Sequence, residues 1–184
     1  MISKYFLVII MIKVILFIAI SADGFIADKD GGIAWLDEYN NTSEDCGYNE
    51  FYQSIDALAI GNTTYKQVLT FGPWNFNGKT SYIFSDKDTP VIENEYIELV
   101  GSNIPAFMKK AENDGVKRLW LMGGARLAES FYDLGLIDEY IITIVPKKLG
   151  HGIALPASIL AAKDMHLVKS IEFPSGIVQN HYKK

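Results

Sequence analysis

The feature that most constrains the fold is an apolar run that ends in two glycines and passes at once into a helical pattern. Residues 119–122 are apolar, Gly123 and Gly124 follow, and the next apolar residues recur at helical spacing, at Leu127, Phe131 and Leu134. Gly135 stands where a glycine commonly ends a helix. A strand that turns on glycines into a helix presents backbone N–H groups at the positive end of the helix dipole, so a phosphate can bind there. The motif alone fits a phosphate site and a tight turn without a ligand equally well.

Strand and helix patterns alternate along most of the chain. We predict strands at residues 14–20, 57–60, 81–84, 97–100, 117–122, 139–145, 166–173 and 177–182. We predict helices at residues 48–55, 62–69, 105–113 and 125–134, with Asn62 or Thr63 as an N-cap and Pro105 as a first helical residue. Residues 21–49 are expected to be mostly irregular, with a turn at 28–32. This order predicts an α/β domain with a mixed sheet, helices on both faces and an antiparallel C-terminal hairpin.

The composition indicates one domain of a reducing compartment. The chain has 184 residues, of which 49% are hydrophobic, so it can bury a sizeable core. Its formal net charge is −5 and no basic patch with interleaved aromatics stands out, which argues against nucleic acid as a partner. Cys46 is the only cysteine, so an internal disulfide is excluded.

The N-terminal residues leave two interpretations open. Residues 5–22 are almost all apolar, with Lys13 as the only charge, so an exported or membrane-anchored protein has to be considered. Met11 is also a plausible second start, followed by a buried central strand. We favour a cytoplasmic protein without a membrane segment, in which residues 1–10 are an upstream extension and residues 11–184 form the domain.

Several catalytic and metal-binding classes are disfavoured. His151, His166 and His181 show no paired spacing, so we predict no metal site. Gly78-Lys79-Thr80 lacks the earlier glycine and the following helix of a nucleotide-hydrolase loop.

Two further corners follow predicted strands. Gly61 to Thr64 leads from one strand into a helix, and Ser85 and Lys87 follow another strand. Open α/β sheets bind ligands at the carboxyl ends of their strands. If these strands are neighbours, the corners can together hold one extended ligand that carries several phosphates.

An ordered set of motifs resembles a known superfamily. The motifs are Ile20-Ser21-Ala22-Asp23-Gly24-Phe25-Ile26-Ala27, Ile33-Ala34-Trp35-Leu36, Ala59-Ile60-Gly61-Asn62-Thr63-Thr64-Tyr65, Leu121-Met122-Gly123-Gly124-Ala125 and Gly135-Leu136-Ile137-Asp138-Glu139-Tyr140. From Met11 to the C-terminus the chain resembles the dihydrofolate reductase superfamily, in the branch similar to the reductase domain of the riboflavin-pathway deaminase/reductase. The resemblance implies a three-layer fold around a mainly parallel sheet of about eight strands, and NADPH as the cofactor.

The resemblance also assigns cofactor-binding positions. Ala19, Ile26 and Ala27 would lie along the nicotinamide and its ribose. Gly61, Asn62, Thr63 and Thr64 would meet the adenosine-side phosphates, and Ser85 the adenine ribose. Gly123, Gly124, Ala125, Arg126 and Leu127 would surround the pyrophosphate. Dihydrofolate reductases usually carry Arg or Lys where this chain has Asn62, so we expect a weak preference for NADPH over NADH, with Lys87 as the substitute partner of the 2′-phosphate.

The expected reaction is hydride transfer from NAD(P)H to a C=N or C=O bond of a small pteridine- or aminopyrimidine-like substrate, similar to 5-amino-6-(5-phosphoribosylamino)uracil reduction. Trp35, Phe51 and Tyr52 are candidate walls of the substrate pocket, with core packing as the alternative. Asp23 is a candidate substrate contact or a turn residue. No catalytic proton donor stands out; Asp45 and Glu50 are the nearest matches to a folate-binding carboxylate, and helix-start residues explain them equally well. A non-catalytic nucleotide-binding sensor or scaffold is the alternative function.

The C-terminal hairpin predicts a homodimer. It is expected at an edge of the sheet, where Ile171, Phe173 and Ile177 would leave apolar surface to cover. The related reductase domains also pair, so the resemblance points the same way.

Overall fold

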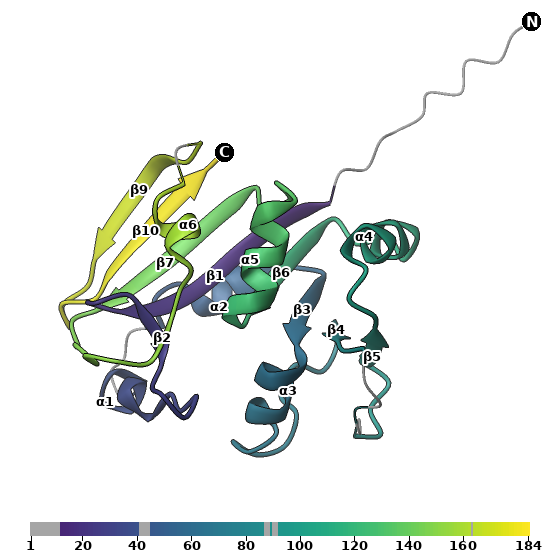
Figure 1. Ribbon diagram of the computed structural model, residues 1–184, viewed down its shortest axis with the longest axis horizontal. Helices are drawn as coiled ribbons and strands as arrows, with labels where there is room; N and C mark the ends of the chain where they lie inside the picture. Colours follow the sequence, from purple (N-terminus) through teal and green to yellow (C-terminus); the bar gives the residue numbers. More distant parts are fainter. Residues whose placement is uncertain (1–11, 41–44, 87–88, 90–91, 163) are drawn as a thin grey trace, which may run out of the picture.

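The fold is a three-layer α/β domain around one eight-stranded sheet (Figure 1). The computed structural model describes residues 12–40, 45–86, 89, 92–162 and 164–184. The sheet strands are β1 (Lys13–Ser21), β3 (Ala57–Gly61), β4 (Thr80–Phe84), β5 (Ile97–Val100), β6 (Arg118–Gly123), β7 (Glu139–Val145), β9 (His166–Glu172) and β10 (Val178–Lys183). The main helices are α2 (Tyr48–Ser54), α3 (Asn62–Val68), α4 (Ile104–Asn113) and α5 (Ala125–Asp133). The predicted fold class is confirmed.

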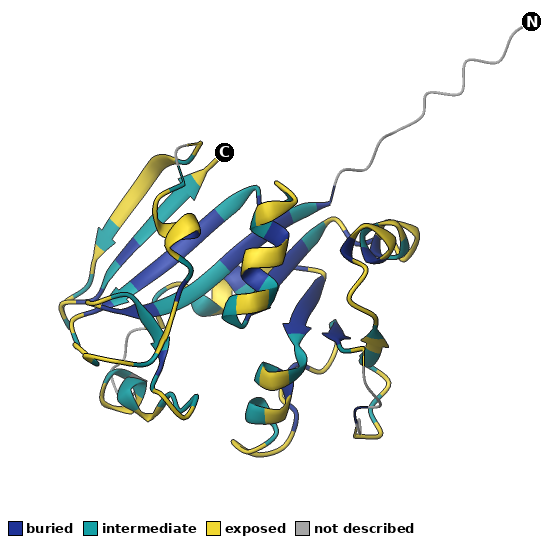
Figure 2. Cartoon of the chain, viewed as in Figure 1, coloured by how far each residue is buried: buried dark blue, intermediate teal, exposed yellow. Residues whose placement is uncertain are grey.

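The sheet order is β5-β4-β3-β6-β1-β7-β10-β9. The first six strands are parallel, and β10 runs antiparallel to β7 and to β9. The central strand β1 is buried on both faces over its first half, as expected for a continuous apolar run between parallel neighbours. Figure 2 shows the buried residues concentrated in these central strands and the edge strand β9 largely exposed.

Each face of the sheet has its own hydrophobic core. On one face, Val14 and Leu16 of β1 pack with residues of α4 and α5. On the other, Ile15 packs with Phe51 of α2 and Tyr65 of α3. In Figure 1, α5 lies in front of the sheet and α2 behind it. The two faces are called here the α5 face and the α2 face.

The helix after the two glycines ends as predicted. Gly135 has a φ of 66°, its N–H donates to Tyr132 O at 2.8 Å, and the Leu136 N–H donates to Phe131 O at 3.0 Å. This is the paired hydrogen bonding of a glycine-terminated helix, and it explains why a side chain is disfavoured at Gly135.

Two predicted helix starts are wrong in detail. Gly61, rather than Asn62 or Thr63, is the N-cap of α3, and no side chain caps that helix. Pro105 is the second residue of α4, because Asn103 caps the helix by accepting from the Ala106 N–H at 3.0 Å. In both cases the helix begins earlier in the chain than local preference indicated.

The segments expected to be irregular contain small elements. They are β2 (Phe25–Ala27), β8 (Ile153–Ala154), the 3-10 helix η1 (Ala34–Leu36), α1 (Asp37–Asn40) and α6 (Ala157–Leu160). Strands β2 and β8 pair with each other in a separate two-stranded sheet, with Phe25 opposite Ala154. The predicted turn at 28–32 is present, since the Gly31 N–H donates to Asp28 O and the Asp28 N–H to Gly32 O.

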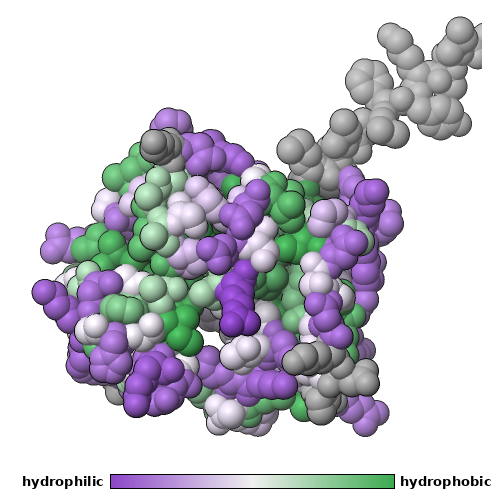
Figure 3. Space-filling view, in the orientation of Figure 1, coloured by the Kyte–Doolittle hydropathy of each residue, from purple (hydrophilic) through white to green (hydrophobic). Residues whose placement is uncertain are grey.

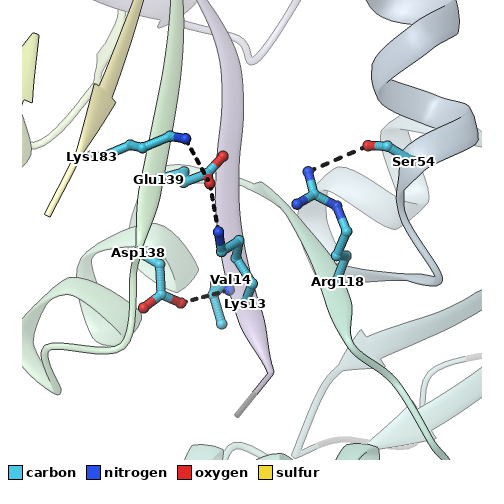
Figure 4. Close-up of polar contacts among 7 residues, drawn as sticks. All are labelled: Lys13, Val14, Ser54, Arg118, Asp138, Glu139 and Lys183. Carbon is cyan, nitrogen blue, oxygen red and sulfur yellow. Dashed lines mark hydrogen bonds and ion pairs between the residues drawn. The ribbon is translucent and has the colours of Figure 1, made fainter. Parts of the chain in front are cut away.

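The amino ends of the central strands carry an ionic cluster (Figure 4). Glu139 Oε1 lies 2.9 Å from Lys13 Nζ and 3.7 Å from Lys183 Nζ. Burial alone would raise the pKa of Glu139, but these two ammonium groups and Arg118 lower it. The cluster therefore favours the charged carboxylate at the end of the sheet opposite the glycine corners.

The predicted extension at residues 1–10 lies outside the described residues. Within the described part of the chain, every helix is too short or too polar to cross a membrane.

Candidate cofactor and substrate site

The glycine corners meet at one edge of the sheet. Strand β3 pairs with both β4 and β6, so the corners after these three strands are neighbours, as the sequence interpretation required. A Cβ atom built on Gly61 would lie 3.4 Å from Gly123 O and 3.6 Å from Gly124 N. The peptide between Gly123 and Gly124 is cis. A Cβ at Gly61 would thus be in van der Waals contact with the neighbouring corner.

The start of α5 provides hydrogen-bond donors at this place. Gly124 is the N-cap of α5 without a side-chain cap, and the first helical hydrogen bond runs from the Ala128 N–H to Gly124 O at 3.0 Å. The N–H groups of Ala125, Arg126 and Leu127 come before that first bond in the chain. No carbonyl group of the helix can therefore accept from them. A Cβ on Gly124 would lie 3.1 Å from Thr64 Oγ1. Two helix starts and a hydroxyl therefore surround one small space, which suits an anion.

The surface is open beside this space. In the space-filling view the molecule is hollowed between the lobe that contains β2 and the part that contains α3 (Figure 3). Figure 1 places the lower end of α5 next to that hollow. A ligand at the corners would therefore be reachable from solvent.

The other predicted adenosine-side residues lie around the same corners. Asn62 Oδ1 is buried without a hydrogen-bond partner among the described residues. Thr63 is exposed, and Ser85 Oγ lies 2.8 Å from the Thr89 hydroxyl. Lys87, the predicted substitute partner of a 2′-phosphate, lies outside the described residues.

The middle of β1 is only partly covered, whereas Ile20 and Ser21 at its end are buried. Phe17, Ile18 and Ala19 are half-buried although β1 has neighbours on both edges. Side chains alternate between faces along a strand, so both faces of the sheet are incompletely covered here. Ile18 lies near Gly123, because a Cβ on Gly123 would lie 4.0 Å from Ile18 Cδ1. Ala19 is thus close to the corners and is accessible, while Ala27 of the β1–β2 segment is buried and Ile26 half-buried.

Asp23 connects two loops. Its Oδ1 accepts from Ser21 Oγ at 2.6 Å and from the Leu149 N–H at 3.1 Å, and its Oδ2 accepts from the Gly150 N–H at 2.7 Å. Chiefly through the Ser21 bond, these contacts lower the pKa of Asp23 to about 2. The carboxylate therefore holds the β1–β2 segment against the loop after β7, and its oxygens are engaged within the protein rather than free for a substrate.

We expect Asp23→Ala to loosen the β1–β2 segment and to weaken cofactor binding, because Ile26 and Ala27 follow directly. Since the folded pKa is depressed, the stabilising effect of Asp23 is complete above its ordinary value of 3.8 and is lost as the pH falls through about 2. Amide hydrogen exchange at residues 24–27 should accelerate in the variant at pH 7. Unchanged exchange there would show that the β2–β8 pairing alone holds the segment.

The predicted aromatic walls differ in their burial. Phe51 is 6% exposed and stacks on Phe17 with ring centroids 4.4 Å apart, so it belongs to the core of the α2 face. Tyr52 and Trp35 are half-buried, and both the Tyr52 hydroxyl and Trp35 Nε1 lack a hydrogen-bond partner among the described residues. The structure thus favours core packing for Phe51 and keeps Tyr52 and Trp35 as candidate wall residues.

The two carboxylate candidates lie at the start of α2. Asp45 accepts from the Gly47 N–H at 2.9 Å and from the Asn49 N–H at 3.2 Å, and these bonds lower its pKa. Glu50 is exposed in the first helical turn. Asp45 therefore shapes the turn into α2, and neither residue is placed as a proton donor by these contacts.

Three further residues border the same region, and the sequence interpretation singled out neither Thr143 nor Gln179 among them. Tyr48 lies over Phe17, with ring centroids 6.4 Å apart. Thr143 and Gln179 are buried polar residues in register with Ala19. For Thr143 the sequence signal was a polar residue within the apolar strand β7, whereas Gln179 lies in the mostly polar strand β10 and had no such signal.

A cavity of about 590 Å³ lies at the opposite end of α5. Its lining includes Tyr132, Tyr140, Asp164 and Lys184. The Lys184 ammonium donates to Gly135 O at 2.8 Å and lies 3.8 Å from Asp164 Oδ2. The cavity is thus remote from the glycine corners, and a lysine of the chain itself lies in it.

Fold and site together define a dihydrofolate-reductase-like α/β protein in which two glycine corners meet at the carboxyl ends of neighbouring parallel strands. Residues 12–179 match the model of the RibD C-terminal domain, and the chain belongs to that family. It is 34% identical over 171 residues to YwjB and 30% identical over 182 residues to YyaP, two uncharacterized proteins of Bacillus subtilis (strain 168). The matches cover 92% of this chain in both cases, and 97% and 94% of the two relatives.

Solved structures agree with the family. A candidate riboflavin biosynthesis protein from Shewanella sp. PV-4 is 28% identical, with a TM-score of 0.84 over 94% of this chain and 98% of that chain. A deaminase/5-amino-6-(5-phosphoribosylamino)uracil reductase from Thermotoga maritima shares the fold, with a TM-score of 0.72 and 15% identity. The match covers 94% of this chain but only 56% of that longer protein.

Proposed function

We propose that this protein is an NAD(P)H-dependent reductase of a small heteroaromatic substrate. The observation that carries the proposal is the contact between the Gly61 and Gly123-Gly124 corners beside the half-buried residues 17–19 of β1. Membership of the RibD C-terminal domain family supports a reductase-like role. Our proposal includes a cytoplasmic location, which the single cysteine of the sequence supports.

The residues at the corners fit a dinucleotide. Side chains are absent at Gly61 and Gly124, where a Cβ would approach Gly123 O and Thr64 Oγ1. The N–H groups at the start of α5 would hold the pyrophosphate, and Ala19, Ile26 and Ala27 would border the nicotinamide. When bound, NAD(P)H supplies a hydride. The protein would position the acceptor carbon and exclude water with the aromatic side chains of α2.

The substrate side of the site suits a flat ring. Tyr48 and Tyr52 stack with centroids 5.9 Å apart, and Trp35 precedes them in the chain. Burial raises the pKa of both tyrosine hydroxyls, so these groups stay protonated at neutral pH. A pteridine or an aminopyrimidine would match such aromatic surfaces, and its C=N or C=O bond would accept the hydride.

The test is cofactor binding followed by turnover. Calorimetry should show binding of NADPH, and NADPH oxidation should be followed at 340 nm with pterin and aminopyrimidine acceptors. Tight binding without oxidation by any such acceptor would favour the alternative, a nucleotide-binding sensor or scaffold. Absence of NADPH and NADH binding would refute both functions.

The preference for NADPH over NADH is expected to be weak, because Asn62 carries no charge. We expect Asn62→Lys to raise the affinity for NADPH relative to NADH about tenfold, since a charge-assisted contact to a phosphate contributes about 1.5–3 kcal/mol. Lys87→Ala should weaken NADPH binding more than NADH binding, so that the ratio of the two dissociation constants moves closer to one. An unchanged ratio in Lys87→Ala would exclude that residue as the 2′-phosphate partner.

We still propose a homodimer, but through a different apolar surface of the hairpin from the one that the sequence predicted. Ile177 is buried and Ile171 and Phe173 are half-buried, whereas Leu167 and Val168 of the edge strand β9 are 56% and 54% exposed. An open edge with exposed apolar residues favours association. Light scattering should give twice the 20.6 kDa mass of one chain, and Val168→Lys should lower it. A single-chain mass for the wild type at micromolar concentration would exclude the dimer.

A further inference from the structure

Two buried polar side chains lie side by side on the α2 face of the sheet. Gln179 of β10 is 2% exposed and Thr143 of β7 is 6% exposed. The strand register places Gln179 opposite Thr143, and Thr143 opposite Ala19 of β1. This row thus begins at the half-covered strand of the proposed substrate site. Buried polar groups are costly unless they are hydrogen-bonded, so their partners reveal what they hold.

The Gln179 amide has a partner on each side. Its Nε2 donates to Cys46 O at 2.9 Å and to Thr143 Oγ1 at 3.0 Å, and its Oε1 lies 2.8 Å from His181 Nε2. A backbone carbonyl only accepts, so the contact with Cys46 O determines which side of the amide is nitrogen. The Oε1 then accepts from His181, whose Nε2 must carry the proton. The orientation of the side chain is therefore fixed from both ends.

The Cys46 carbonyl belongs to the turn that begins α2. Cys46 and Gly47 both have positive φ angles, 48° and 73°, and Gly47 is the N-cap of the helix. Asp45 accepts from two N–H groups inside this turn. Those bonds shape the turn, whereas the Gln179 bond attaches it to the sheet, 133 residues away in the chain.

The attachment sets the position of the helix that carries the proposed substrate wall. Helix α2 has seven residues, so each end contributes strongly to its placement. Its middle is held by the stacking of Phe51 on Phe17. Its carboxyl end lies near Arg118, whose guanidinium donates to Ser54 Oγ at 3.4 Å. Gln179 supplies the contact at the amino end, next to Tyr48.

We propose that Gln179, supported by Thr143, is a positioning residue for the substrate: it holds the Cys46–Gly47 turn on the sheet and so sets the distance between Tyr48 and the half-buried residues 17–19 of β1. The proposal rests on the proposed reductase function, because it assumes that the substrate ring lies between α2 and β1. It assigns to β10, which touches none of the glycine corners, a role in substrate binding but none in cofactor binding.

The test compares Gln179→Met, which keeps the length of the side chain and removes its hydrogen bonds, with Asn180→Ala. Asn180 is the next residue of the same strand, points to the other face and accepts from Ser170 Oγ at 2.7 Å. Amide hydrogen exchange at residues 47–51 should accelerate about tenfold in Gln179→Met and remain unchanged in Asn180→Ala. Unchanged exchange in Gln179→Met would overturn the attachment itself.

The substrate role is tested by binding of two probes, biopterin by fluorescence and NADPH by calorimetry. Gln179→Met should bind biopterin about tenfold more weakly at an unchanged NADPH affinity, and Thr143→Ser, which keeps the hydroxyl, should behave as wild type. Unchanged biopterin affinity, or equal weakening of both probes, would overturn the positioning role. Failure of the wild type to bind NADPH would instead refute the proposed reductase function. The hydrogen-exchange experiment does not depend on NADPH binding, so it would still test whether Gln179 attaches the turn to the sheet.

If Gln179→Met does not fold, the wild-type protein still provides a test. The Gln179 side-chain amide protons should be protected from exchange with solvent in NMR spectra, because both donate to protein acceptors. Rapid exchange of these protons would overturn the proposal.

Discussion

Gly124→Val is expected to abolish detectable NADPH binding while the domain stays folded. The valine Cβ would lie 3.1 Å from Thr64 Oγ1, and its methyl groups would extend into the space at the start of α5. Gly124 has a φ of −68°, which valine can adopt, so the damage is confined to the corner. A displaced phosphate would lose charge-assisted hydrogen bonds worth about 1.5–3 kcal/mol each, so we expect at least a hundredfold loss of affinity.

Calorimetry with NADPH measures this effect, and a thermal melt checks the fold. Ala157→Val is a suitable control, because it adds the same methyl groups at an exposed position of α6. Wild-type affinity in Gly124→Val would show that the glycine corner is only a tight turn.

Phe51→Ala is expected to lower the free energy of unfolding by about 3–5 kcal/mol, the usual cost of removing a buried phenyl ring. The ring stacks on Phe17 and meets Trp120 edge-on with centroids 5.4 Å apart. Trp120 in turn donates from Nε1 to Phe17 O at 3.1 Å. The melting temperature should therefore fall by roughly 10 °C for a domain of this size.

The matched control is Tyr52→Phe, one position further along α2. The Tyr52 hydroxyl has no hydrogen-bond partner among the described residues, so its removal should change stability little. If Phe51→Ala kept its stability but lost biopterin binding, Phe51 would be a substrate contact rather than a core residue.

The elements that the sequence predicted well are those with a strong local pattern. Strand β1 is a continuous apolar run, and a strand with parallel neighbours on both sides needs one. Helix α5 has an apolar stripe and a terminal glycine, and both signals lie within a dozen residues. The sequence also showed both glycine corners, but their meeting depended on β3 and β6 being neighbours, which the strand order of the sheet supplied.

The small elements around the site could not be predicted in the same way. Strands β2 and β8 have three and two residues, too few for a periodic pattern, and each exists only because the other pairs with it. Ile177 was expected to add to an exposed apolar edge, but it is buried in the folded domain.

What the sequence determined by itself is the long strands and main helices, the two glycine corners and the family to which they belong, since these depend on residues close together in the chain. Tertiary structure alone decided which side chains complete the site. Asp23 meets the 149–150 backbone and Gln179 meets Cys46 across more than 120 residues of sequence. Such contacts depend on how the strands are ordered in the sheet, and a pattern of neighbouring residues carries no record of that order.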